Sequence, residues 1–124
     1  MKTQANIHLL RKQLEARLVT ERNDPMAPPV DGWIRTLRTA LGMSASQLAR
    51  QLDVTKQAVA NIERADREGT LSLTTYRKVA ETLGCQLKVV LVPKKPLETI
   101  VMERARQVAT RLVRQTSQRS IYPR

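Results

Sequence analysis

The chain has 124 residues, 41% of them hydrophobic, and a formal net charge of +11. This length and apolar content suit one folded domain with appendages. The excess of basic residues predicts a polyanionic partner, and nucleic acid is the leading candidate. One cysteine, Cys85, and one histidine, His8, exclude an internal disulfide and a Cys/His metal site. We therefore expect no metal and no cofactor.

Hydropathy gives no sign of a membrane protein. The longest strongly apolar run, Val89–Val92, is far shorter than the roughly 20 residues that span a bilayer. Lys2 is not followed by the long apolar stretch of a signal peptide. We expect a cytoplasmic protein with no membrane partner.

Residues 1–30 predict a helix followed by a linker. Apolar residues recur at spacings of three and four as Ile7, Leu10, Leu14 and Leu18, which indicates a narrow apolar stripe over a helix at 6–19. The stripe either docks on the rest of the domain or packs against a partner chain. The prolines between 23 and 31 cannot propagate a helix, so this stretch is a predicted linker.

Residues 31–84 contain the pattern of a helix-turn-helix. Ser44 and Gln47 form a capping box at the start of a short helix. Asp53 then stands where the chain must turn, and Asp enters left-handed conformations more cheaply than most residues. Thr55 can cap a second helix. Capping, turn and packing requirements agree over this stretch, which makes an ordinary helix pair the weaker interpretation.

Two further helices flank this motif in the same predicted domain. One begins at Asp31 as its cap, includes Trp33 as a core residue and stops at Gly42. After a predicted polar loop at 65–70, Ser72 caps the other, which Gly84 ends. The second motif helix leaves Lys56, Gln57 and Asn61 on its outer face. A glutamine amide can bond adenine bidentately, and a lysine can reach guanine acceptors.

Residues 85–93 predict a single β-strand, because they are dense in β-branched residues and end at Pro93. No other segment has comparable β character, and a lone strand leaves its backbone groups unpaired. We therefore expect it to pair with a second copy as a dimerisation strand, or with another protein.

Residues 94–124 predict a basic helix and tail. The segment 93–124 holds eight Lys and Arg residues against two acids. Arg104, Arg111 and Arg114 lie beside an apolar stripe on this helix. They are either a solvated face or auxiliary contacts with DNA phosphates or an acidic partner surface.

The motif also resembles a known family. Leu48-Ala49, Val54-Thr55, Val59 and Ile62-Glu63 are similar to the Xre type, or phage Cro and repressor type, of DNA-binding domain. This resemblance implies a mainly α fold, with a five-helix lambda-repressor-like helix-turn-helix domain drawn largely from 31–83. Residues 32 to about 118 resemble more closely the mobile mystery protein A group, through pieces such as Gly32-Trp33-Ile34 and Leu91-Val92-Pro93.

The resemblance implies a transcriptional regulator and assigns roles to residues. Lys56, Gln57 and Asn61 become base contacts, and Ser46, Thr55 and Arg64 become phosphate or backbone contacts. Plainer roles exist: Thr55 as a cap, Arg64 as the partner of Glu68, and Asn61 as a solvated residue. Ala45 and Ala60 stand where relatives commonly carry polar residues, which reduces the number of contacts.

The predicted function is a sequence-specific double-stranded DNA-binding regulator. It is expected to be an autorepressor that binds an inverted-repeat operator as a homodimer. The alternative is an antitoxin that neutralises a Fic-domain toxin partner, which the resemblance implies. Fic inhibitors often carry a Ser or Thr four residues before a Glu-Gly pair. In this chain the pair is Glu68-Gly69, and Arg64 stands at the Ser or Thr position. An enzyme is disfavoured, since no Ser, His and acid set and no glycine-rich phosphate loop is present.

Overall fold

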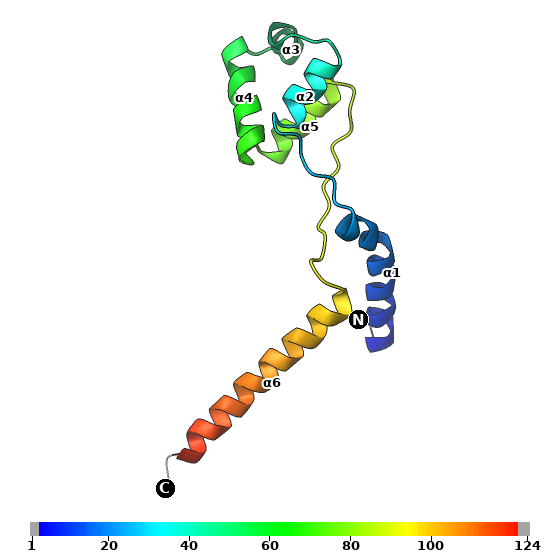
Figure 1. Cartoon of the computed structure of the whole chain (residues 1–124), viewed down its shortest axis with the longest axis vertical. Helices are drawn as coiled ribbons and strands as arrows, with labels where there is room; N and C mark the ends of the chain where they lie inside the picture. The colour runs from blue at the N-terminus through cyan, green and yellow to red at the C-terminus, as the bar shows by residue number, and fades with distance from the viewer. Residues whose placement is uncertain (1–2, 122–124) are drawn as a thin grey trace. The chain divides into compact units, whose positions relative to one another are not determined.

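The computed structural model describes the backbone of residues 3–121 and the side chains of residues 3–117. Over this range the fold is mainly α, as predicted (Figure 1). The chain forms two compact units. One comprises residues 27–90, and the other combines the residues up to Met26 with those from Leu91 onward.

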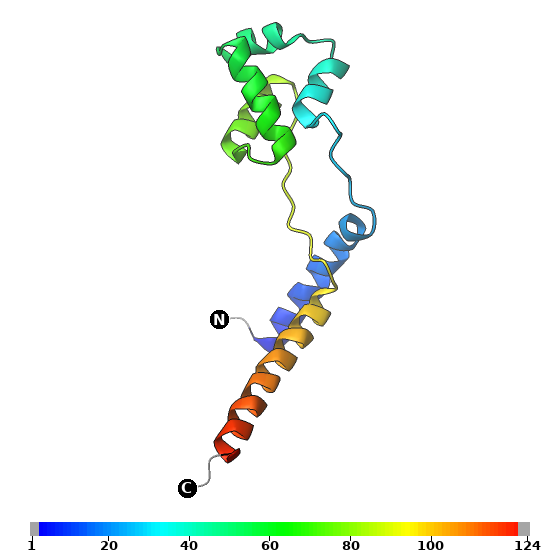
Figure 2. The same cartoon turned by 60° about the vertical axis from the view of Figure 1, so that its left-hand side comes forward.

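The unit of residues 27–90 contains four helices around one core (Figures 1 and 2). They are α2 (Trp33–Ala40), α3 (Ala45–Leu52), α4 (Lys56–Glu68) and α5 (Leu73–Thr82). The buried hydrophobic residues of this core are Ile34, Leu48, Ala49, Leu52, Val59, Val79 and Leu83. Every helix of the unit therefore contributes to the same core or borders it.

Short-range side-chain bonds set the helix starts that the sequence predicts. At α3 the Gln47 amide N–H donates to Ser44 Oγ at 3.1 Å, and the Ser44 N–H donates to Gln47 Oε1 at 2.7 Å. At α4 the Ala58 N–H donates to Thr55 Oγ1 at 3.0 Å. Asp53 adopts the left-handed conformation, with φ 56° and ψ 47°. The predicted turn between the two motif helices is thus confirmed.

Three predictions within this unit need correction. The structure has four helices between residues 31 and 84, and not five. The segment predicted as a loop at 65–70 is largely helical, because α4 continues to Glu68 and ends only at Gly69, whose φ is 75°. Trp33 is 37% exposed and does not belong to the buried core.

The predicted β-strand at 85–93 is not formed by the single chain. These residues have no regular secondary structure, and no strand occurs elsewhere in residues 3–121. A strand needs a neighbour to accept and donate its backbone hydrogen bonds. The apolar, β-branched composition alone does not supply that neighbour.

The second unit contains α1 (Gln4–Asn23) and α6 (Leu97–Ile121), which meet through polar contacts. Arg11 donates from Nε to Glu98 Oε1 at 3.0 Å. Glu15 accepts from the Leu97 N–H at 3.2 Å and also pairs with Arg22. The bond from Arg22 holds the pKa of Glu15 below its ordinary value. Among the residues whose side chains are described in this unit, none is buried.

The start of α2 differs from its prediction. Asp31 is not the cap; Gly32 occupies this position with φ 83° and supplies no side-chain bond. Instead Asp66, from α4, accepts the Ile34 N–H at 2.9 Å through Oδ2. A carboxylate at a helix start satisfies a free N–H group and also favours the helix dipole. The N-terminus of α2 is therefore capped from another helix.

Gly32→Ala is expected to lower the free energy of unfolding by about 2 to 4 kcal/mol, because it combines a positive φ with disruption of a charged hydrogen bond. A Cβ atom at Gly32 would lie 2.7 Å from Asp66 Oδ2. Gly42→Ala is a matched control, since Gly42 has a similar φ of 70° with no atom within 4 Å of its Cβ position. Urea unfolding measures both variants. Equal losses in the two would contradict a role for the Asp66 contact.

Candidate nucleic-acid interface

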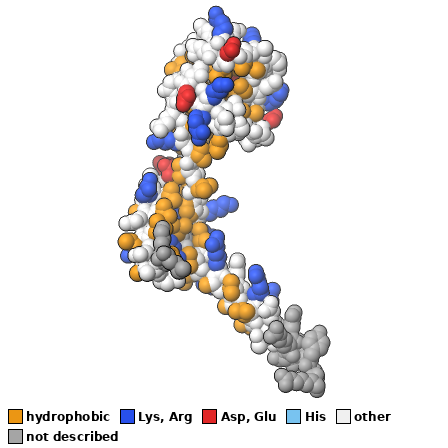
Figure 3. Space-filling model, turned by 180° about the vertical axis from the view of Figure 1, so that it is seen from behind, with side chains coloured by type: hydrophobic (Ala, Val, Ile, Leu, Met, Phe, Trp, Pro, Cys, Tyr) orange, Lys and Arg blue, Asp and Glu red, His pale blue; other side chains and the backbone are white. Residues whose placement is uncertain are grey.

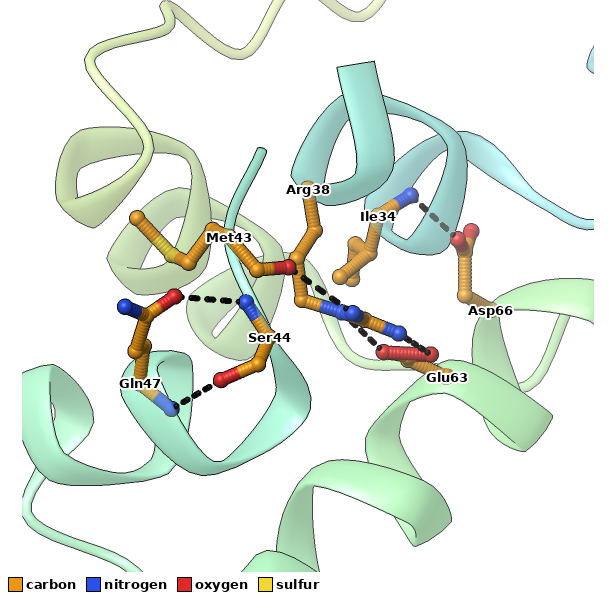
Figure 4. Close-up of polar contacts among 7 residues, drawn as sticks. All are labelled: Ile34, Arg38, Met43, Ser44, Gln47, Glu63 and Asp66. Atoms are coloured by element: carbon orange, nitrogen blue, oxygen red, sulfur yellow. Dashed lines mark hydrogen bonds and ion pairs between the residues drawn. The ribbon is translucent and has the colours of Figure 1, made fainter. Parts of the chain in front are cut away.

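The two motif helices pack through buried apolar residues, and a buried ion pair joins α4 to α2. Leu48 of α3 and Val59 of α4 are both less than 2% exposed. Arg38 of α2 donates from Nε to Glu63 Oε1 at 2.8 Å and from Nη2 to Oε2 at 3.2 Å (Figure 4). Its remaining Nη1 donates to the carbonyl oxygen of Met43 at 3.0 Å.

This arrangement connects three parts of the motif through one guanidinium group. Met43 directly precedes the Ser44 cap of α3, and Glu63 lies in the middle of α4 (Figure 4). The side chains of Arg38 and Glu63 are 13% and 7% exposed. A planar guanidinium suits such two-pronged recognition of a carboxylate. The entry to α3 and the axis of α4 are consequently held together.

The opposite face of α4 presents the predicted base-contact residues. Lys56, Gln57 and Asn61 are all exposed, in the first two turns of the helix. Gln57 Nε2 donates to Asn61 Oδ1 at 3.2 Å. Arg64 Nη2 donates to the same oxygen at 2.9 Å. The structure therefore brings Gln57, Asn61 and Arg64 together as one hydrogen-bonded row. Arg64 is bonded to Asn61 and not to Glu68, the partner that the sequence had suggested for it.

The other two predicted backbone contacts lie at helix starts. Ser46 is exposed in the first turn of α3, and Thr55 is exposed at the cap of α4. Because the Thr55 oxygen accepts the Ala58 N–H, its hydroxyl proton still has a direction in which it can donate. The structural role of Thr55 as a cap is thus compatible with a contact to a phosphate.

The three arginines predicted as auxiliary contacts belong to α6, in the other unit. Arg111 and Arg114 line one side of the helix together with Arg106. Arg104 lies two turns before Arg111 on the same side of the helix and borders a groove beside Leu97 and Val101. Sequence reasoning missed Arg106 as a member of this basic side of the helix.

Sequence reasoning also missed the three residues that support the α4 face, Arg38, Glu63 and Asp66. The positions of the two acids could have indicated that they are buried, because Glu63 and Asp66 follow the apolar Val59 at helical spacing. An acid on the apolar side of a helix must find a partner when it is buried. In the part of the chain with described side chains, no buried side-chain nitrogen or oxygen lacks a hydrogen-bond partner.

Comparison with known proteins agrees with this geometry. Residues 34–90 match the model of a family described as helix-turn-helix. The match covers 57 of the 124 residues, and the same residues contain the α3, turn and α4 geometry of a helix-turn-helix. The matched family is of the Xre type, whose members bind DNA. No curated protein and no solved structure matches the chain.

The helix-turn-helix domain carries no sign of a metal centre: across the described residues, no cluster of His, Cys, Asp and Glu could hold an ion. Within the same limits, no helix is long and apolar enough to cross a membrane.

Proposed function

We propose that the chain is a sequence-specific double-stranded DNA-binding transcriptional regulator that places α4 in the major groove. The observation that carries the proposal is the hydrogen-bonded row of Gln57, Asn61 and Arg64 on the exposed face of α4. In helix-turn-helix proteins the second motif helix lies in the major groove and its N-terminal residues contact base edges. Lys56 and Gln57 are the first two residues of α4.

Gln57 is the residue best placed for direct readout. It donates one N–H of its amide to Asn61, which leaves the second N–H and Oε1 of this exposed group to face a ligand. A donor and an acceptor on one planar amide match N7 and N6 of adenine. Asn61 orients this amide, and Lys56 beside it can reach the acceptors of a guanine.

Phosphate contacts complete the proposed interface. Ser46, Thr55 and Arg64 lie at the helix starts and along the exposed row, where they would fix the register without reading sequence. The arginines of α6 would add sequence-independent affinity, which depends steeply on salt because each neutralised phosphate releases counterions. We further propose that two copies act on an inverted repeat and that the operator lies in the chain's own promoter. Half-sites would then be about 34 to 36 Å apart, or a multiple of this distance.

Gln57→Ala is expected to weaken binding to the specific site by about 1 to 3 kcal/mol and to relax the base preference at one position. Footprinting on the chain's own promoter locates the site. Titration of that duplex and of a random duplex with the wild-type and variant chains, at two salt concentrations, then gives the loss of binding affinity. Gln51→Ala is the matched control, because Gln51 is an exposed glutamine on α3. An equal loss of affinity on both duplexes for Gln57→Ala would contradict the assignment.

A partner protein is the second candidate. The resemblance to the mobile mystery protein A group implies a Fic-domain toxin, and the α1–α6 unit has apolar side chains exposed for a protein contact. In this alternative the chain is an antitoxin and its binding to DNA is autoregulation. Co-purification of a neighbouring gene product with the chain, and inhibition of that product, would establish it.

A further inference from the structure

The α1–α6 unit has polar contacts between its helices in place of a buried core. All buried hydrophobic residues of the described chain belong to the unit of residues 27–90. Figure 3 shows hydrophobic side chains of the α1–α6 unit at its surface. Helices in water draw most of their stability from packing an apolar face. Without such a face, the hydrogen bonds at the start of α6 have a larger part in forming the helix.

The start of α6 has no cap from its own segment. Pro96 directly precedes the helix, and its carbonyl oxygen accepts the Ile100 N–H at 3.1 Å, so Pro96 stands at the N-cap position. Helices usually carry Ser, Thr, Asp or Asn there, because these side chains accept a free N–H of the first turn. A proline side chain has no acceptor. The first turn of α6 therefore needs an acceptor from elsewhere in the chain.

Glu15 of α1 supplies this acceptor. Its Oε1 accepts the Leu97 N–H at 3.2 Å. Arg22 donates to both oxygens of the Glu15 carboxylate, and its Nη1 also donates to the carbonyl oxygen of Lys95 at 3.4 Å. The side chains of Glu15 and Arg22 are only 26% and 15% exposed. One ion pair of α1 thus holds the residues on both sides of Pro96.

The other charged groups at this helix start are paired as well. Glu98, in the first turn of α6, accepts from Arg11 Nε at 3.0 Å and lies 3.1 Å from Nδ1 of His8. Both partners belong to α1. Lys95 pairs with Glu103 at 2.7 Å. These contacts leave Glu15 as the acid that serves the first backbone N–H group of the helix.

We propose that Glu15 is a cap supplied by α1, which makes the first turn of α6 conditional on the docking of α1. The two helices then form a switch. In its closed state Glu15 caps α6, and in its open state the start of α6 frays and α1 is released. A ligand that binds Glu15 or Arg22 in the open state would shift this equilibrium and open the start of α6.

The switch also concerns the helix-turn-helix domain, because residues 27–90 lie between α1 and α6 in the sequence. In the closed state both ends of that domain lead into one unit, and in the open state they lead into two separate helices. The proposal needs no DNA. Its failure would therefore leave the proposed function untouched.

Acid is one means of opening the switch. The bond from Arg22, and after it the bond from the Leu97 N–H, hold the pKa of Glu15 below its ordinary value of 4.5. The cap is consequently complete above pH 4.5 and is lost as the pH falls through the lower pKa of the folded chain. Leu97→Pro removes this N–H at a helix position where proline is well tolerated. Carbon-13 NMR titration should then show a higher pKa for Glu15, and an unchanged pKa would overturn the proposal.

Amide hydrogen exchange of the full chain, followed by NMR without DNA, tests the cap directly. In Glu15→Ala the amides of residues 100–102 are expected to exchange about fivefold to tenfold faster, the factor that loss of a capping side chain produces. Glu21→Ala is the matched control, because Glu21 is an exposed acid of the same helix. It should leave this exchange unchanged.

A second variant separates the loss of a cap from other effects of the substitution. Pro96→Asp gives α6 a capping side chain of its own. Added to Glu15→Ala, it should restore slow exchange at residues 100–102. Failure of this rescue would overturn the proposal, as would unchanged exchange in Glu15→Ala or equal acceleration in Glu21→Ala. Acceleration that extends to α3 would also overturn it, because Glu15 would then stabilise more than the start of α6.

Discussion

Glu63→Ala is expected to lower the free energy of unfolding of the helix-turn-helix domain by about 3 to 5 kcal/mol, the cost of leaving a buried charge without its partner. Glu63 accepts two hydrogen bonds from Arg38, and both side chains are largely buried. Without the carboxylate, the Arg38 guanidinium keeps only the Met43 carbonyl. Urea unfolding followed by circular dichroism measures the loss.

The same position offers two informative comparisons. Glu68→Ala removes an exposed carboxylate from the same helix and should change stability by less than about 0.5 kcal/mol. The double variant Arg38→Met with Glu63→Leu should recover much of the loss, since apolar replacement of a buried pair is often neutral. A double variant as unstable as Glu63→Ala would contradict the view that the unpaired cation causes the loss.

Asp66→Ala is the second substitution with a large expected effect, about 3 to 6 kcal/mol, because two hydrogen bonds to a charged group disappear together. Asp66 accepts the Ile34 N–H at the start of α2 and the hydroxyl of Tyr76 from α5. Both donors would lose their acceptor. Asp31→Ala is the matched control, since Asp31 is exposed beside the same helix start. A comparable loss for Asp31→Ala would show that the cap had been misassigned.

Tyr76 adds a pH-dependent readout to the Asp66 variant. Burial, together with the bond to Asp66, raises the pKa of Tyr76 from 10.0 to about 12. The folded state therefore keeps a proton that the unfolded state loses. The resulting stabilisation is complete below pH 10 and is lost as the pH rises through 12. Unfolding at alkaline pH should show this dependence reduced in Asp66→Ala and removed in Tyr76→Phe.

The local features of the motif could be predicted because they depend on near neighbours in the sequence. The Ser44 and Gln47 pair lies three residues apart, as do Thr55 and the Ala58 N–H that it caps. The exposure of Gln57 and Asn61 followed from helical periodicity. Each of these signals lies within one helical turn of the sequence, so it can be recognised without knowledge of the tertiary structure.

The features that could not be predicted depend on contacts between distant residues. Asp66 lies 32 residues from Ile34, and Glu63 lies 25 from Arg38. Polar residues in 65–70 therefore suggested a solvated loop, although tertiary contacts hold Asp66 inside a helix. The β-branched residues of 85–93 suggested a strand for the corresponding reason: β propensity describes how a side chain fits a sheet and does not provide the sheet.

The shared acceptor on Asn61 has an evolutionary consequence. Gln57 and Arg64 both donate to its Oδ1, so the proposed base contact and the proposed phosphate contact are coupled through one side chain. Energies of residues in one hydrogen-bond network do not add. Substitutions that retarget this domain to another operator should therefore be epistatic: a new residue at 57 would succeed or fail according to which residue stands at 61.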